Sequence, residues 1–254
     1  MTRIVRFTPT SPLALWLATL TAACLFLQPP AAQAATVGSG KVATEIRTVP
    51  GDFDAIALAG SIDLVVHQAA KQAVTVSADD NVLALIETVV EQRAAGPTLV
   101  IRFKRGESLR RVSKAEVRVD VVHLRALSSA GSGDLRVGAL TTPTLKLSLS
   151  GSSDARLQGL STGSLEVSIA GSGDIGASGS AKQVRVGIAG SGDADLAALN
   201  ADAVSVHIAG SGDASVTANQ QLEVSIAGSG DVRYGGAVTN VKSSVAGSGS
   251  VTRR

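Results

Sequence analysis

The sequence has little cysteine and few aromatic residues. Its one cysteine, Cys24, lies within the first 34 residues, so the rest of the chain cannot form a disulfide framework. Aromatic residues make up 2% of the chain, and beyond residue 34 only Phe53, Phe103 and Tyr234 remain. A polysaccharide-active enzyme that holds its substrate on several stacked aromatic rings is therefore poorly served by this composition.

Charge is also scarce, at 17% of residues, whereas hydrophobic residues make up 44%, which is enough for a buried core. The first 34 residues carry only Arg3 and Arg6, so without them Lys and Arg fall from 23 to 21, against 21 Asp and Glu. The net charge of the remaining chain is zero. A general role in nucleic-acid binding therefore has no electrostatic basis, and we expect no nucleic-acid partner.

Residues 1–34 have the composition of a secretory signal peptide. Arg3 and Arg6 precede an apolar stretch from Leu13 to Leu27, and Ala32-Gln33-Ala34 supplies the small residues that signal peptidase recognises. Cleavage before Ala35 would release an exported chain that does not span a membrane. The location expected is the periplasm, the outer envelope or the extracellular space.

This segment has two alternative interpretations, a membrane anchor and a lipidation site. A membrane anchor needs about 20 apolar residues, and the stretch here is shorter. Lipidation at Cys24 needs a leucine three residues earlier, where the sequence has Thr21.

One phrase, Ala-Gly-Ser-Gly-Asp, recurs through the C-terminal half of the chain, with one variant copy and one decayed last copy. Successive copies are 18 to 20 residues apart, and their leading glycines are Gly131, Gly151, Gly171, Gly190, Gly210, Gly228 and Gly247. A fixed period of this length is typical of a solenoid or another repeat architecture.

The segments that precede the turns alternate apolar and polar residues, as in Leu165-Glu166-Val167-Ser168-Ile169. This alternation predicts half-buried β-strands, and each Gly-Ser-Gly allows a tight turn. No Asn-Gly or Asp-Gly hairpin turn occurs between the strands. The sequence therefore predicts an all-β protein, a parallel β-helix (β-solenoid) of about 19–20 residues per rung.

Stacking the rungs places like residues in columns. One inward column is apolar: Leu149, Ile169, Ile188, Ile208, Ile226 and Val245. One outward column mostly alternates in charge: Lys146, Glu166, Arg185, Ser205, Glu223 and Lys242. Opposite charges on adjacent strands favour this alignment.

Residues 35–129 are less regular and are expected to start and cap the solenoid, forming one continuous domain with the repeats at 130–254. Strands are expected at Val74-Thr75-Val76, Leu99 to Phe103 and Val117 to Val122. Asp79 or Asp80 is expected to cap a short helical turn.

The order of these elements resembles a known family. Phe53-Asp54-Ala55-Ile56, Gly60-Ser61-Ile62-Asp63-Leu64 and the Gly-Ser-Gly-Asp repeats are similar to the putative auto-transporter adhesin head domain, or GIN domain, over about residues 45–250. The resemblance implies a β-helical fold and a cell-envelope setting. It supplies no catalytic residues, and the family's function is not established.

The aspartates of the repeats should stack in a column: Asp134, Asp154, Asp174, Asp193, Asp213 and Asp231. One hypothesis is a ladder that binds Ca²⁺ between carboxylates about 4.8 Å apart. The other is that each aspartate caps its own turn by accepting backbone N–H groups. We favour turn capping, so no cofactor is expected.

Residues 102–125 are rich in basic side chains. The candidate patch for an anionic ligand is Arg102, Lys104, Arg105, Arg110, Arg111 and Lys114. Such a patch could bind anionic lipid, lipopolysaccharide or an acidic glycan. The alternative is an ordinary solvated surface.

Motifs of catalysis are weak in this sequence. Gly171 to Gly176 matches G-x-G-x-x-G, but no helical sequence follows and the sibling turns lack the third glycine. His67, His123 and His207 are isolated, and no serine lies in G-x-S-x-G. We therefore expect no catalytic site.

The function expected is that of an exported envelope protein that presents a rigid β-helical surface for binding or adhesion, to an envelope protein or a glycan. A polysaccharide-active enzyme and a purely structural envelope component are the alternatives. The last rung, from Val241 to Val251, should be an open edge through which copies could self-associate.

Overall fold

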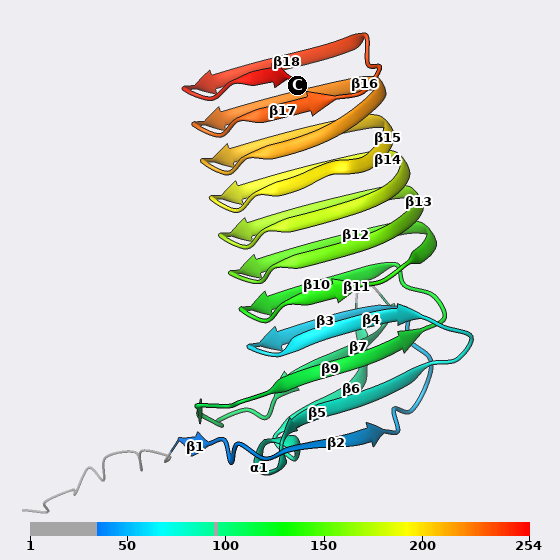
Figure 1. The fold of residues 1–254 in the computed structure, drawn as a ribbon, viewed down its shortest axis with the longest axis vertical. Coiled ribbons are helices and arrows are strands. Elements are labelled where there is room, and N and C mark those ends of the chain that lie inside the picture. Colours follow the sequence, from blue (N-terminus) through cyan, green and yellow to red (C-terminus); the bar gives the residue numbers. More distant parts are fainter. Residues whose placement is uncertain (1–34, 94–95) are drawn as a thin grey trace, which may run out of the picture. The chain divides into compact units, whose positions relative to one another are not determined.

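The computed structural model describes residues 35–93 and 96–254. The predicted signal peptide, residues 1–34, lies outside them. The described residues form one compact unit, which is mostly β-structure. Figure 1 shows that unit as a β-solenoid of stacked, flattened rungs above a mixed sheet at the N-terminal end. The solenoid has about six turns, which confirms the predicted fold.

Each central rung is one long strand that bends once, followed by a tight turn. These strands are β13 (Ala155–Gly171), β14 (Ile175–Gly190), β15 (Ala194–Gly210) and β16 (Ala214–Gly228). On either side lie β10 (Ala126–Gly131), β11 (Leu135–Val137), β12 (Leu140–Gly151), β17 (Val232–Gly235), β18 (Asn240–Gly247) and β19 (Val251–Arg253). All neighbouring rungs pair in parallel.

The register between rungs agrees with the repeat. Ile169 pairs with Ile188, which pairs with Ile208, and the apolar column is at most 2% exposed from Leu149 to Ile226. Burying each of these side chains stabilises the fold by about 1.5–3 kcal/mol relative to exposure. The outward column also aligns, and Lys146 forms an ion pair with Glu166 at 2.8 Å.

The first glycine of each turn is required by close packing between rungs. Gly171 has a φ of 136°, and a Cβ on it would collide with the carbonyl oxygen of Gly151. The next residue joins the same two rungs, because the N–H of Ser172 donates to the Gly151 carbonyl at 2.9 Å. Any larger residue at this glycine would force the rungs apart.

One turn departs from the repeat, with Ser153 in place of the second glycine. The residue beneath it, Ser129, occupies the column that holds Leu149 in the next rung. Both serines are buried, at 1% and 2% exposed, and their hydroxyl oxygens are 2.8 Å apart. In a regular rung, a Cβ on Gly192 would come within 2.9 Å of Ile169 Cγ2. The two serines therefore replace an isoleucine and a glycine as a matched pair.

The N-terminal portion contains the first rung of the solenoid. The sequence predicts a start and a cap in this portion and does not identify this rung. That rung consists of β3 (Ala55–Gly60) and β4 (Asp63–Gln68). β3 pairs in parallel with β10, so that Gly60 aligns with Gly131 although residues 69–125 lie between the two rungs. The sequence Gly60-Ser61-Ile62-Asp63 is thus a diverged copy of the repeated turn.

Beneath this rung, residues 69–125 build the cap (Figure 1). β7 (Gly96–Phe103) pairs in parallel with β3, and β9 (Ala115–Val121) pairs in parallel with β4. The antiparallel strands β6 (Ile86–Arg93), β5 (Ala73–Asp79) and β2 (Val42–Arg47) complete the mixed sheet. The expected strands of this portion are confirmed.

The expected short helix is present as α1 (Asp80–Leu83), but its predicted cap is wrong. Asp79 occupies the N-cap position, yet its side chain makes no capping hydrogen bond. It is fully buried and bonds to a different segment instead, as described below.

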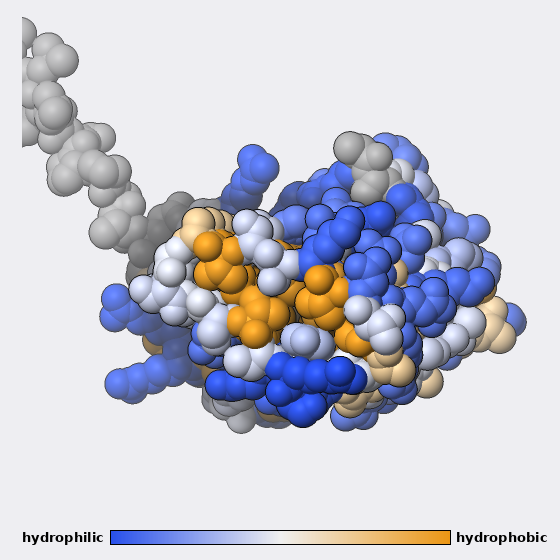
Figure 2. Space-filling model, turned by 90° about the horizontal axis from the view of Figure 1, so that it is seen from above, coloured by the Kyte–Doolittle hydropathy of each residue, from blue (hydrophilic) through white to orange (hydrophobic). Residues whose placement is uncertain are grey.

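The last rung is open. Val241 and Val245 are 37% and 41% exposed, whereas Leu222 and Ile226, which precede them in the same columns, are 0% and 2% exposed. Figure 2, which views this end, shows an apolar patch surrounded by hydrophilic residues. No helix within residues 35–93 and 96–254 has the length and hydropathy of a membrane span.

A candidate cleft at the base of the aspartate ladder

The repeated aspartates form the predicted column, but five of the six cap the turn of the following rung and not their own. The exception is Asp134, whose carboxylate pairs with Arg136 at 3.1 Å. The N–H of Asp193 donates to Asp174 Oδ1 at 2.8 Å, and the N–H of Asp213 donates to Asp193 Oδ1 at 2.8 Å. The same bond joins Asp174 to Asp154 at 3.1 Å and Asp231 to Asp213 at 2.8 Å. The expectation of an Asx-turn within each copy is therefore corrected, because the acceptor serves the next rung.

The ladder begins one rung earlier than expected. Asp63 Oδ1 accepts the N–H of Asp134 at 3.0 Å, so the first rung takes part. In the last copy, Ser250 donates both its N–H and its hydroxyl to Asp231 Oδ1, at 2.9 and 2.8 Å. These two hydrogen bonds lower the pKa of Asp231, with the hydroxyl contributing most.

The calcium hypothesis gains no geometric support from this arrangement. Within the described part of the chain, no three His, Cys, Asp or Glu side chains gather as metal ligands would. Ca²⁺ takes six to eight oxygen ligands, and one oxygen of most of these carboxylates is already engaged by a backbone N–H. Whether the column binds Ca²⁺ stays an untested alternative.

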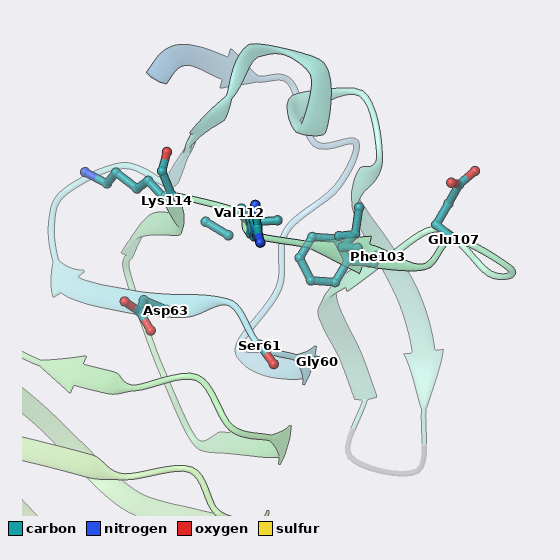
Figure 3. Close-up of a pocket in the computed structure, with 11 residues that line it drawn as sticks. Gly60, Ser61, Asp63, Phe103, Glu107, Val112 and Lys114 are labelled. Carbon is teal, nitrogen blue, oxygen red and sulfur yellow. The ribbon is translucent and has the colours of Figure 1, made fainter. Parts of the chain in front are cut away.

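A cleft of about 590 Å³ lies at the lower end of the ladder. The turn of the first rung, Gly60 to Asp63, forms one wall, and the segment from Phe103 to Ala115 forms the other. In Figure 3 the ring of Phe103 and the side chain of Ser61 border the same space, whereas Glu107 and Lys114 lie at opposite ends. A volume of this size is within the range of small-molecule sites.

Asp79 fixes the outer wall of the cleft. Its buried carboxylate accepts the N–H of Ser113 at 3.1 Å and the N–H of Gly40 at 3.3 Å, and it also accepts the Ser113 hydroxyl. The bonds from Ser113 hold the pKa of Asp79 below its ordinary value, the hydroxyl contributing most. One buried side chain thus ties together two segments that are distant in sequence.

A second contact holds the same wall. β1 (Thr36–Val37) pairs in parallel with β8 (Leu109–Arg110), and the N–H of Gly38 donates to the Arg110 carbonyl at 3.0 Å. A Cβ on Gly38 would collide with the Asp79 carboxylate and lie 2.7 Å from the Arg111 carbonyl oxygen. The close approach of these backbones therefore depends on glycine.

Arg111 has an unusual backbone within this wall. Its φ is 51°, and it is the only non-glycine residue with positive φ in the described ranges. Left-handed backbone is disfavoured for an arginine and is maintained only where the surroundings impose it. The bonds on both sides of Arg111, at Arg110 and Ser113, supply that constraint.

The structure divides the predicted basic patch. Arg102 is not available to a ligand, because its guanidinium pairs with Glu87 at 3.0 Å and Glu91 at 3.1 Å on the neighbouring strand β6. Arg111 and Lys114 line the cleft, and Lys114 lies 3.4 Å from Glu116. The remaining three are exposed along the same segment: Lys104, Arg105 and Arg110.

The three histidines lie apart on the surface. His67, His123 and His207 are exposed, and His207 lies in an outward column, between Gly187 and Ser225. Its imidazole Nε2 is 3.2 Å from the hydroxyl of Ser205.

Solved structures share this fold. The chain is similar to "a putative adhesin" from Bacteroides fragilis NCTC 9343, with 25% identity and a TM-score of 0.78, over 87% of this chain and all of that one. It is also similar to a "Putative lipid binding protein" from Parabacteroides distasonis ATCC 8503, with 26% identity and a TM-score of 0.71, over the same shares. A "putative adhesin" from Parabacteroides merdae ATCC 43184 matches with 25% identity and a TM-score of 0.66, over 87% and 99% of the two chains.

No protein of curated function matches the sequence. One family model does match, over residues 52–237, and its description is "Putative auto-transporter adhesin, head GIN domain". The match covers the first rung, the cap and most of the solenoid, and it agrees with the resemblance seen in the motifs. The chain therefore belongs to this GIN-domain family, a family of unknown function whose description implies a surface or exported location.

Proposed function

We propose that this protein is an exported, non-catalytic binding protein of the cell envelope, which recognises an envelope protein or a glycan. The observation that carries the proposal is the cleft of about 590 Å³ at the base of the aspartate ladder. The composition of residues 1–34, as a cleavable signal peptide, supports export to the periplasm or beyond.

The solenoid provides a rigid support for the cleft. Its rungs are joined by continuous parallel pairing on the strands and by two further bonds at most turns, from the serine N–H and the aspartate N–H. A site on such a frame is held in a fixed geometry, which lowers the entropic cost of binding. The cleft lies against the first rung and shares that rigidity.

The open last rung is a second contact surface in this proposal, and its occupant is another copy of the chain. Residues 240–254 carry Lys242, Arg253 and Arg254 and no acidic side chain, so two such ends repel each other. The strand β2 at the opposite end pairs only with β5 among the described strands. It exposes Ile46 at 78%, and its one acidic residue, Glu45, pairs with Arg47 of the same strand at 3.0 Å. A head-to-tail contact therefore matches apolar to apolar groups and avoids the repulsion between two basic ends.

Binding to whole cells and to isolated envelope glycans tests the proposed function. The purified protein, labelled with a fluorophore, should bind one of these surfaces saturably, and unlabelled protein should compete. The same glycans should be recovered intact after incubation, by chromatography of the products. Release of shorter fragments would show that the protein is an enzyme, and the absence of any saturable binding would refute the proposal.

A further inference from the structure

One backbone donor at the cleft lacks the partner that its counterparts have. In the repeats, the turn serine donates its N–H to the glycine carbonyl one rung earlier, as Ser132 does to Gly60 and Ser152 does to Gly131. Ser61 belongs to the first rung, and no earlier turn lies beneath it. Its N–H has no acceptor among the described residues, and Ser61 lines the cleft. An acceptor atom of a ligand can occupy this position.

One cation in the cleft is also without a partner. Arg111 forms no ion pair within residues 35–93 and 96–254, whereas Lys114 lies 3.4 Å from Glu116. The nearby carboxylate of Asp63 already accepts the N–H of Asp134. The guanidinium of Arg111 is therefore the group available to a ligand anion, and its planar fork suits a carboxylate.

The backbone of Arg111 indicates that its position is imposed. Gly38, Asp79 and Ser113 hold its neighbours, and its φ of 51° is one that an arginine rarely adopts. Strain of this kind gathers at ligand sites, where the surrounding structure maintains it.

The third element of the cleft is the ring of Phe103, one of three aromatic residues beyond residue 34. A Cβ on Gly60 would lie 3.1 Å from this ring, so the glycine leaves the ring edge in contact with the turn. Figure 3 shows the ring directed at the space above Ser61. An apolar ring surface beside a cation and a backbone donor matches the faces of a sugar that carries a carboxylate.

We propose that the cleft binds the carboxylate-bearing ring of an acidic sugar. Arg111 pairs with the carboxylate, the Ser61 N–H donates to a ligand oxygen, and Phe103 packs against the apolar face of the ring. This inference rests on the proposed function, which it narrows to one ligand class.

A membrane surface fits the same place less well. The segment 104–114 contains no exposed large hydrophobic side chain among its described residues, and the strand β1 beside it presents only Val37, which is 53% exposed. One valine is little to insert into a bilayer. The site is concave, and Ser61, Arg111 and Lys114 line one cavity, with the carboxylate of Glu107 at the end away from Lys114 (Figure 3). A small anionic ligand is therefore favoured over a lipid headgroup layer.

The test compares two probes that differ only at the carboxyl group, which is a charged carboxylate in one and a neutral methyl ester in the other. Galacturonate oligosaccharides and their fully methyl-esterified forms have the same rings, and binding of each is measured by titration calorimetry. The wild-type protein should bind the acid at least tenfold more tightly than the ester. Arg111→Ala should weaken binding of the acid by about ten- to a hundredfold, as expected for a lost charged hydrogen-bonded pair. Arg111→Lys should fall between them, because a point charge remains without the fork.

Arg156→Ala is the matched control, since Arg156 is exposed on β13, outside the cleft, and it should bind like the wild type. Phe103→Leu keeps an apolar side chain and should weaken both probes, and thermal melts verify that each variant is folded. Equal binding of acid and ester, unaffected by Arg111→Ala, would overturn this inference while leaving a glycan-binding function intact. Binding only to phosphatidylglycerol vesicles, whose headgroup carries a phosphate and no carboxylate, would also overturn it, in favour of a lipid phosphate.

Discussion

The matched serines Ser129 and Ser153 allow a sharp test of how the rungs pack. Ser153→Gly removes one hydroxyl and leaves that of Ser129 buried without its partner, at a cost of about 1–3 kcal/mol in the free energy of unfolding. Ser129→Ile alone places a branched side chain beneath the Cβ of Ser153. The regular rungs show a distance of about 3 Å for such a contact, so overpacking should cost about 1–3 kcal/mol. Burying the Ser153 hydroxyl without a partner adds to that cost.

The double variant restores the arrangement of the regular rungs. With glycine at 153 the isoleucine at 129 has room, and its burial contributes about 1.5–3 kcal/mol relative to exposure. We therefore expect the double variant to be at least as stable as the wild type. The coupling energy between the two changes should be at least about 3 kcal/mol, because the double variant removes both unpartnered hydroxyls and the overpacking, and it is measured by urea unfolding of all four proteins.

A second pair of changes serves as the control. Ser152 is exposed, so Ser129→Ile combined with Ser152→Gly should show additive costs. If the costs of Ser129→Ile and Ser153→Gly are additive as well, within about 0.5 kcal/mol, the steric explanation of this irregular rung is wrong.

Three further predictions follow from the ladder, the acidic groups and the open end. Asp193→Ala should lower the free energy of unfolding by about 1 kcal/mol because the N–H of Asp213 loses its acceptor, whereas Asp193→Asn, which keeps an acceptor oxygen, should cost less; equal losses would exclude this bond as the cause. The pKa values of Asp79 and Asp231 are lowered in the folded protein, so their stabilisation is complete above the ordinary carboxyl pKa of 3.8 and is lost as the pH falls through the lowered folded-state values. Asp79→Asn should therefore flatten the acid limb of a pH–stability curve, and an unchanged limb would contradict the assignment. Head-to-tail contact predicts a light-scattering mass that rises with protein concentration, and Val245→Lys should keep the protein monomeric; a concentration-independent mass for the wild type would refute it.

The solenoid could be predicted from the sequence because its contacts repeat. A rung of 18 to 20 residues aligns each residue with its counterpart, so one period reveals every column. The pairing of Ile169 with Ile188 and the ion pair between Lys146 and Glu166 agree with that alignment. The alternation of apolar and polar residues and the turn glycines were sufficient to predict the strands and turns of the solenoid.

The first rung was harder to recognise because residues 69–125 interrupt the period. Gly60-Ser61-Ile62-Asp63 differs from the repeated Gly-Ser-Gly-Asp only at Ile62, and this similarity is the one indication in the sequence that Gly60 stacks on Gly131. The spacing between Gly60 and Gly131 is not a multiple of the 18 to 20 residues that separate the other copies.

The cleft could not be predicted, because its geometry depends on contacts between distant segments. Asp79 looked like a helix cap from its local sequence, whereas its partners, Gly40 and Ser113, lie more than 30 residues away in either direction. The sequence indicated the basic patch only as a local excess of basic residues. Its division, with Arg102 paired on β6 and Arg111 in the cleft, depends on the strand pairing of the cap.

Because the rungs are alike, the recognition site and the length of the solenoid can change independently of each other. The cleft uses residues of the cap and the first turn alone, and the last rung lies at the other end of the repeats. Insertion or loss of one repeat would change the distance between them by about 4.8 Å and alter neither. The number of repeats therefore determines the length of the solenoid. Related chains with different numbers of repeats would hold the same recognition site at different distances from the last rung.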